Sequence, residues 1–208
     1  MKTDSLAKYS DNVIKNIYEA KPQMTFPIKL GFYTADKTLQ LLEDSLSKIN
    51  SVKKVYSLPE TLVRRDPPTY FTDYYDVVPG PVDLNQLRYL AAQGRTDLLL
   101  YCGASYEENV ETNGWAWTNI LLFPVLFMPS YHINIDAKAE IFLFDVRNNY
   151  LYLYKKFSNN FQERYVKYSR TERDEREKIE EELIKELMPQ IIQAVEKELN
   201  NPENKKTE

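Results

Sequence analysis

The chain is short of the residues from which many catalytic and metal centres are built. Its 208 residues include one cysteine, one histidine and five glycines. Cys102 has no second cysteine with which to form an internal disulfide, and Cys102 with His132 is too few for a Cys/His zinc site. No run of 18 apolar residues occurs, so the sequence predicts no membrane-spanning helix.

An excess of positive charge is missing too. Lys and Arg number 27 against 31 Asp and Glu, which gives a formal net charge of −4. Nucleic-acid-binding domains normally carry a basic stripe, so no nucleic-acid partner is expected. A hydrophobic fraction of 43% with 13% aromatic residues is enough for a packed core and excludes wholesale disorder.

The first half of the chain has the pattern of an α/β domain. Alternating residues over 26–33 predict a strand, a stripe of apolar residues over 37–49 predicts a helix, and 52–58 predict a second strand parallel to the first. Asp83 caps a second helix, and Gly94 is expected in the left-handed region at its end. The apolar stretch 96–101 that follows predicts a central strand buried on both faces.

The second half predicts an antiparallel hairpin and a long helix. Strict alternation from Tyr131 to Ala139 predicts a strand over 131–145, and Asn148-Asn149 allows a turn into a second strand over 149–157. A stripe of apolar residues from Ile179 to Leu199 predicts a long helix docked by one face.

Together these patterns predict one α/β (α+β mixed) domain over 26–200. It has a mixed sheet of about five strands, both crossover helices on one face, the hairpin 131–145/149–157 and a long C-terminal helix. Residues 1–25 are expected to be a helical extension and 201–208 a disordered tail. A purely parallel, doubly wound fold is the rival, and it would need a helix within 131–157.

The conventional catalytic candidates have simpler interpretations. The alternation places His132 on the solvent-facing side of its strand, where a surface histidine is expected. No base or cation is implied beside Cys102, so a small buried apolar residue is expected there. Glu107, Glu108 and Glu111 could hold a hard cation, as could Asp73 and Asp76, but carboxylates in polar loops are more often simply solvated.

A segment after the central strand and two aromatic clusters are the candidate ligand and partner sites. Residues 103–108 (Gly103 to Glu108) follow the central strand, where α/β sheets usually bind ligands, although no Gly-rich phosphate loop occurs. Exposed aromatic side chains are typical of protein interfaces. The loop 70–75 and the tryptophan pair at 115 and 117 carry such side chains, although either cluster could instead cover the uncovered face of the sheet. The candidate partner-binding residues are Tyr70, Phe71, Tyr74, Tyr75, Trp115 and Trp117.

Three segments carry a family resemblance: 84–100, with its Ala-Ala-Gln-Gly-Arg-Thr-Asp-Leu-Leu-Leu phrase, the apolar 122–129 with its prolines, and 137–149, with Asp145-Val-Arg147. Together they resemble a group of bacterial envelope lipoproteins that includes those called rhombotarget lipoproteins. The fold of this group is similar to that of the curli-secretion lipoprotein, the penicillin-binding-protein activator lipoprotein and the N-terminal domain of the Tol translocation protein. The resemblance covers roughly 26–157 and implies no catalytic residues.

The resemblance implies a non-enzymatic lipoprotein that binds an envelope protein or self-associates, and no cofactor. It places the protein at the periplasmic face of a membrane, held only by a lipid on a cysteine near the mature N-terminus, a position where this chain has no cysteine. Without the resemblance a cytoplasmic location is expected. The alternative is a domain, possibly an enzyme, that binds a small ligand or nucleotide near Gly103–Glu108.

Overall fold

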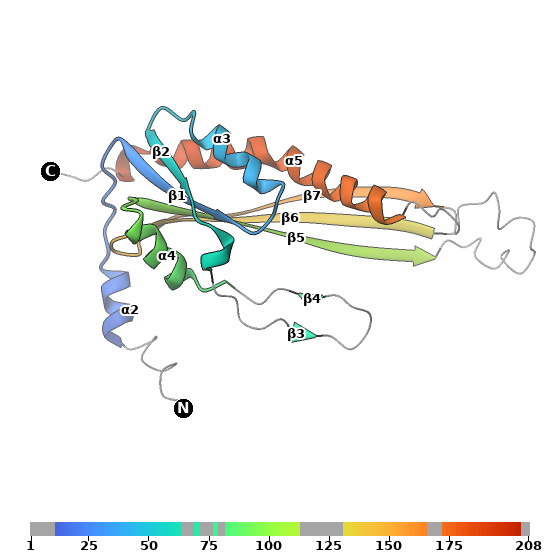
Figure 1. The fold of residues 1–208 in the computed structure, drawn as a ribbon, viewed down its shortest axis with the longest axis horizontal. Coiled ribbons are helices and arrows are strands. Elements are labelled where there is room, and N and C mark those ends of the chain that lie inside the picture. Colours follow the sequence, from blue (N-terminus) through green and yellow to red (C-terminus); the bar gives the residue numbers. More distant parts are fainter. Residues whose placement is uncertain are drawn as a thin grey trace, which may run out of the picture.

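A five-stranded mixed sheet forms the centre of the molecule (Figure 1). The computed structural model describes residues 11–63, 69–70, 77–78, 82–112, 131–165 and 172–204. The strand order is β2-β1-β5-β6-β7; β1 is parallel to β2 and β5, while β6 is antiparallel to β5 and β7. The strands are β1 (Ile28–Thr34), β2 (Val52–Ser57), β5 (Leu98–Thr112), β6 (Tyr131–Asp145) and β7 (Leu151–Tyr165). The predicted mixed α/β fold and the antiparallel hairpin are confirmed.

The helices lie on both faces of the sheet, which differs from the expectation of one face. A 3-10 turn, η1 (Leu39–Leu41), leads into α3 (Leu42–Leu46), which shares a core with the long α5 (Glu172–Leu199). On the opposite face, α4 (Leu84–Gln93) packs against the sheet. The reason is topological. The connection from β1 to β2 leads outward to the edge of the sheet, whereas the connection from β2 to β5 leads back past β1 in the opposite direction. Right-handed connections that move in opposite directions place their helices on opposite faces.

The central strand β5 is buried on both faces, as predicted. Leu98 and Leu100 belong to the larger core beneath α3 and α5, and Leu99 belongs to a smaller core beneath α4; all three are 0% exposed. Gly31 in β1 lies under the end of α4: an added Cβ would lie 3.5 Å from Ala91 Cβ in the helix and 3.1 Å from Thr96 Oγ1 in the segment that follows it. Glycine at this position therefore lets the helix and the sheet come together.

The end of α4 differs by one residue from the prediction. Gly94 keeps a right-handed backbone, and Arg95 takes the left-handed conformation with φ 52°. Arg95 N donates to Ala92 O and Thr96 N to Ala91 O, the paired bonds of a Schellman motif. Thr96 is buried and its hydroxyl also donates to Ala91 O at 2.9 Å, which holds the motif in this register.

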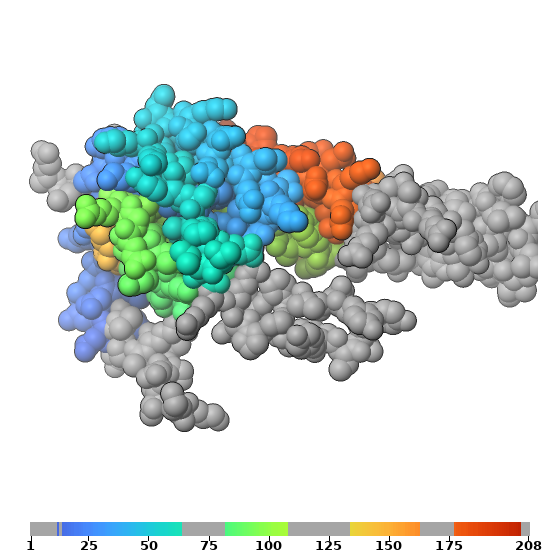
Figure 2. All heavy atoms as spheres, in the orientation of Figure 1, coloured from blue at the N-terminus to red at the C-terminus, as the bar shows by residue number. Residues whose placement is uncertain are grey.

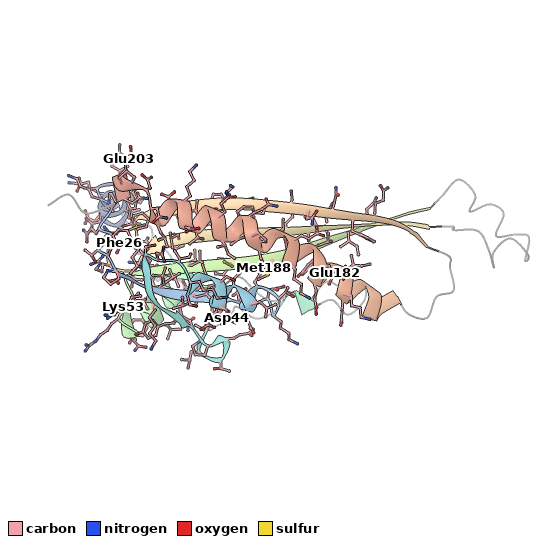
Figure 3. All side chains as sticks on the ribbon, turned by 90° about the horizontal axis from the view of Figure 1, so that it is seen from above. Phe26, Asp44, Lys53, Glu182, Met188 and Glu203 are labelled. Atoms are coloured by element: carbon pink, nitrogen blue, oxygen red, sulfur yellow. The ribbon has the colours of Figure 1, made fainter. Side chains whose placement is uncertain are left out.

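Strands β5, β6 and β7 extend beyond the parallel part of the sheet. β1 pairs with β5 only as far as Cys102, whereas β5 and β6 pair continuously to Thr112 and Tyr131. From Gly103 onward the described sheet is therefore a three-stranded arm. Helix α5 runs along this arm over β6 and β7 (Figure 3). Side chains of α3 lie against those of α5 in the space-filling view (Figure 2).

The segment just before β1 contacts both the β6–β7 turn and the C-terminal end of the described chain. Helix α2 (Asp11–Tyr18) belongs to the expected N-terminal extension. Met24 N, a little further along, donates to Asn204 O. Pro202–Asn204 form a 3-10 turn, η5, and Asn204 is buried. No helix in the described part of the chain is long and apolar enough to cross a membrane.

Short elements connect β2 to α4. A 3-10 turn, η2 (Glu60–Leu62), precedes two strands, β3 (Thr69–Tyr70) and β4 (Val77–Val78), which pair antiparallel. The division of the chain into an extension, one domain and a tail stays a prediction.

Candidate functional site

A row of aromatic rings crosses the face of the sheet opposite α3 and α5; we call this side the open face. Tyr33 stacks on Tyr101 with 6.1 Å between ring centroids, and Tyr101 lies 5.9 Å from Phe142. Phe142 in turn stacks on Tyr154 at 4.7 Å. These four residues belong to β1, β5, β6 and β7, so the row spans four adjacent strands.

Exposure rises along the row from β1 to β7. Tyr33 is 1% exposed in the smaller core, Tyr101 and Phe142 are half-buried, and Tyr154 is 47% exposed. Phe144 adds a further half-buried ring, parallel to Phe142 at 5.9 Å. One end of the row is thus anchored in the core and the other faces solvent, which is the arrangement of a rigid aromatic contact surface.

Gly103 supports this row and does not form a ligand loop. An ideal Cβ on Gly103 would lie 2.9 Å from Tyr101 Oη and 3.3 to 3.4 Å from Tyr101 ring carbons, so the tyrosine ring lies over the glycine. The sequence placed Gly103–Glu108 just after the central strand, but β5 continues to Thr112. These residues therefore lie within β5 and do not follow it, which corrects the position assumed for the alternative ligand site.

Two ion pairs flank the aromatic row on the arm. Lys138 Nζ lies 2.6 Å from Glu107 Oε2, and Lys156 Nζ lies 2.5 Å from Glu140 Oε1. The hydrogen bond with Glu140 raises the pKa of Lys156. Glu107 is thus matched by a cation across the strand pair, and the side chains of Glu108 and Glu111 lie outside the description. No group of three metal-ligating side chains occurs among the residues that the structure describes.

The end of β1, a usual place for ligands in α/β proteins, is filled by the protein's own contacts. Asp36 Oδ1 accepts from Thr38 N and Leu39 N, which starts η1, and Asp36 Oδ2 accepts from Tyr106 Oη at 2.9 Å. Burial raises the pKa of Tyr106, and the neighbouring Asp36 raises it further. Asp36 therefore holds local structure together by accepting from these three donors.

Asp145, in the segment that carries the family resemblance, has a structural role. Its carboxylate is 0% exposed and accepts from Arg147 N at 2.9 Å and Tyr152 Oη at 3.2 Å. Tyr152 Oη accepts from Gln23 N, and Arg147 Nη2 donates to Gln23 O. Burial lowers the pKa of Arg88, and the charge of nearby Asp145 acts in the opposite direction by raising this pKa. The Asp-Val-Arg segment thus fastens residues preceding β1 to the β6–β7 turn.

The remaining candidates divide between confirmed and undescribed residues. Cys102 is buried and reduced, as expected, and burial raises the pKa of its thiol. The backbone of His132 lies in β6 opposite Glu111, but its side chain is not described. Tyr70 lies in β3 with its side chain likewise undescribed. The other predicted residues and the two loop aspartates fall outside the described residues: Phe71, Asp73, Tyr74, Tyr75, Asp76, Trp115 and Trp117.

The aromatic row was missed by the sequence reasoning, although a signal exists. Residues on the polar side of the strand 131–145 run from Asn134 to Glu140 and then change to Phe142 and Phe144. A solvent-facing side that turns aromatic at one end of a strand indicates a contact surface.

Comparison with known proteins returned similarities at the level of structure. No family model and no curated protein sequence matches the chain. A minor lipoprotein from Acinetobacter baumannii is 9% identical with a TM-score of 0.41, over 81% of this chain and 92% of that one. The rare lipoprotein B from Shewanella oneidensis is 14% identical with a TM-score of 0.37, over 83% and 99%. A lipoprotein from Neisseria meningitidis is 13% identical with a TM-score of 0.32, over 80% and 99%.

Proposed function

We propose that this chain is a non-enzymatic lipoprotein of the bacterial envelope that acts as a protein-binding or self-assembling module. The observation that carries the binding role is the aromatic row, which ends in Tyr154 at 47% exposure on the open face. Rings fixed by packing lose little freedom on binding, which favours their use as anchors for a protein partner. The compartment rests on the resemblance of segments 84–100, 122–129 and 137–149 to envelope lipoproteins.

The row is suited to a flat protein surface because of its geometry. Phe142 and Tyr154 are inclined by only 25°, and on the arm side they are bordered by the ion pairs Lys138–Glu107 and Lys156–Glu140, whose charges already neutralise each other. An apolar centre with a polar rim is the usual composition of a protein interface. We place the partner's contact at Phe142 and Tyr154.

The binding role is tested by affinity capture from envelope extracts with the Tyr154→Ala variant. The matched control is Tyr89→Ala, because Tyr89 is 64% exposed on α4, away from the row. We expect partners captured by the wild type and by Tyr89→Ala to be lost with Tyr154→Ala, at unchanged melting temperature. Equal capture by all three proteins would remove the open face from the proposal.

The aromatic residues chosen from sequence remain a second proposed contact. Replacing Tyr70, Phe71, Tyr74 and Tyr75 together by Ser, and Trp115 with Trp117 in a separate variant, tests them in the same capture assay. Lost capture with an unchanged melting temperature supports a contact surface. A large fall in melting temperature means that the rings belong to a core, and their proposed role then fails.

The envelope location is tested separately from binding. When the gene is expressed from its native start, cell fractionation should place the product in the membrane fraction, and fatty-acid labelling should mark it. A soluble, unlabelled product would refute the lipoprotein assignment and leave the binding role to the capture assay. A ligand that binds the folded state raises the melting temperature. Thermal-shift measurements with nucleotides and divalent ions should therefore leave the melting temperature unchanged, and a rise would favour the alternative of a small-ligand site.

A further inference from the structure

The outermost strand of the arm, β7, is a long and regular edge. β7 has 15 residues, contains no proline or glycine, and pairs with β6 in unbroken register from Tyr165 to Leu153. No other strand in the described part of the sheet pairs with its outer edge. Proteins normally protect such edges by shortness, proline, bulges or lysines, because a free edge is a template for another strand.

The other edges of the sheet are less suited to pairing with a copy of themselves. β2 has only six residues, and its charged residues, the exposed Lys53 and Lys54, are both positive, so β2 offers no acidic residue to pair with them. The free edge of β5 beyond Cys102 carries Glu107, Glu108 and Glu111, so two such edges would bring like charges together. β7 differs because it carries both signs of charge.

We propose that two copies of this chain associate by antiparallel pairing of their β7 strands about a twofold axis at Asn159. This deepens, and rests on, the self-assembling part of the proposed function. Residues opposite one another in an antiparallel pair share a face of the sheet, so the two α5 helices would lie on one side. The result is a continuous ten-stranded sheet with closed twofold symmetry, the commonest arrangement of homo-oligomers.

The residue types at paired positions favour this register. With the axis at Asn159, the position of Lys155 lies opposite that of Glu163 of the partner subunit, and Phe157 lies opposite Phe161 of the partner subunit. Lys155 is exposed and Phe157 is 7% exposed. An axis one residue earlier would place Phe157 opposite Asn159 of the partner subunit, and an axis one residue later would place it opposite Glu163 of the partner subunit. Either shift loses the pairing of two phenylalanines. Register in a sheet is fixed by such cross-strand pairs.

Charge reversal tests the pairing between Lys155 and the partner's Glu163. Lys155→Glu and Glu163→Lys should each raise the dimer dissociation constant by about tenfold, since two attractive pairs become repulsive. The double variant should restore the wild-type constant. The matched control is Lys54→Glu, on the opposite edge strand β2. Lys54 Nζ lies 4.5 Å from the centroid of the Tyr56 ring and Lys155 Nζ lies 5.0 Å from that of the Phe157 ring, so both charge reversals remove a similar contact within the subunit. Sedimentation velocity of the full chain gives the constants.

Disulfide trapping tests the position of the axis. In Asn159→Cys the two new thiols face each other across the axis, within the Cα separation that a disulfide spans. In Gln162→Cys they are offset by six residues, or about 20 Å of strand. Oxidation should link the first variant into dimers and leave the second monomeric, and the buried Cys102 stays unreactive in both.

Any of four results would overturn the inference, and three of them concern the monomer–dimer equilibrium and the trapping. One is a monomer at all concentrations, another is a dimer insensitive to both charge reversals, and the third is equal trapping of both cysteine variants. Species larger than a dimer would indicate head-to-tail pairing of β7 with β5 and also contradict the twofold model. Capture of a different protein through Tyr154 is unaffected by these outcomes, so the failure of one proposal is distinguishable from the failure of the other.

Discussion

At the scale of single residues, the most consequential position is Asp145. Its buried carboxylate joins Arg147, Tyr152 and, through the tyrosine hydroxyl, Gln23. These contacts connect the β6–β7 turn with the chain that precedes β1. A buried charge that is fully hydrogen-bonded is costly to disturb, because its partners are left unpaired.

Replacing this carboxylate should lower stability. Asp145→Asn keeps the size but removes the charge and turns a donor toward Tyr152 Oη, so we expect the free energy of unfolding to fall by about 2–4 kcal/mol. Asp136→Asn is the control, because Asp136 lies in the same strand and is half exposed. Urea denaturation measures both variants. A loss below about 0.5 kcal/mol for Asp145→Asn, the range of ordinary surface changes, would contradict the account.

Tyr152 should make stability depend on pH in the alkaline range. Burial raises the pKa of Tyr152 to about 12, against about 10 in the unfolded chain. The folded state therefore favours the protonated ring, and the resulting stabilisation is complete below about pH 10 and lost as the pH rises through about 12.

The comparison with Tyr152→Phe isolates this effect. We expect the wild type to exceed the variant in free energy of unfolding by an amount that shrinks as the pH rises from about 10 to about 12. Urea denaturation at several pH values gives the two curves. A constant difference across this range would show that Tyr152 has an ordinary pKa.

At the scale of elements, alternation along the chain was enough to predict most strands and their pairing. It identified the β6–β7 hairpin and the positive φ at its turn, which Asn149 adopts with φ 64°. It did not identify the outer half of β5, because Glu107 to Thr112 have the polar composition of a loop. In the arm β5 is an edge strand and needs little apolar surface.

Relations between elements were harder to predict than the elements themselves. The placement of α3 and α4 on opposite faces depends on strand order, which a single sequence does not state. The aromatic row has the same origin, since Tyr101, Phe142 and Tyr154 come from three strands and meet only through register. The aromatic clusters chosen from sequence lie in connections, where alternation gives no spatial information.

Helix α5 should be required for the stability of the arm. Ile184 is 0% exposed in the core that α5 forms with the sheet. We expect Ile184→Ala to lower the free energy of unfolding by about 2–5 kcal/mol through the lost burial and the cavity left behind. Glu182→Ala, on the exposed side of the same helix (Figure 3), is the control and should change it by less than about 0.5 kcal/mol. Similar values for both would mean that α5 does not pack on the sheet.

At the scale of the whole molecule, the sheet offers three kinds of surface. One face is covered by α3 and α5, the open face carries the aromatic row beyond α4, and the β7 edge lies along the arm (Figure 1). The open face and the edge meet at Tyr154, which belongs to β7 and ends the row. Association with a partner protein and association with a second copy are therefore separated at other residues: Phe142 belongs to the row and not to the edge strand, and Asn159 belongs to the edge strand and not to the row.

Site-specific photo-crosslinking in living cells tests most directly that the open face contacts a protein. A photoreactive phenylalanine analogue replaces Tyr154 in one strain and Tyr89, the exposed ring on α4, in another. The account predicts discrete protein adducts from position 154 and none of the same size from position 89. An absence of adducts at 154, or an identical set at both positions, would contradict the claim that the aromatic row is a specific binding surface.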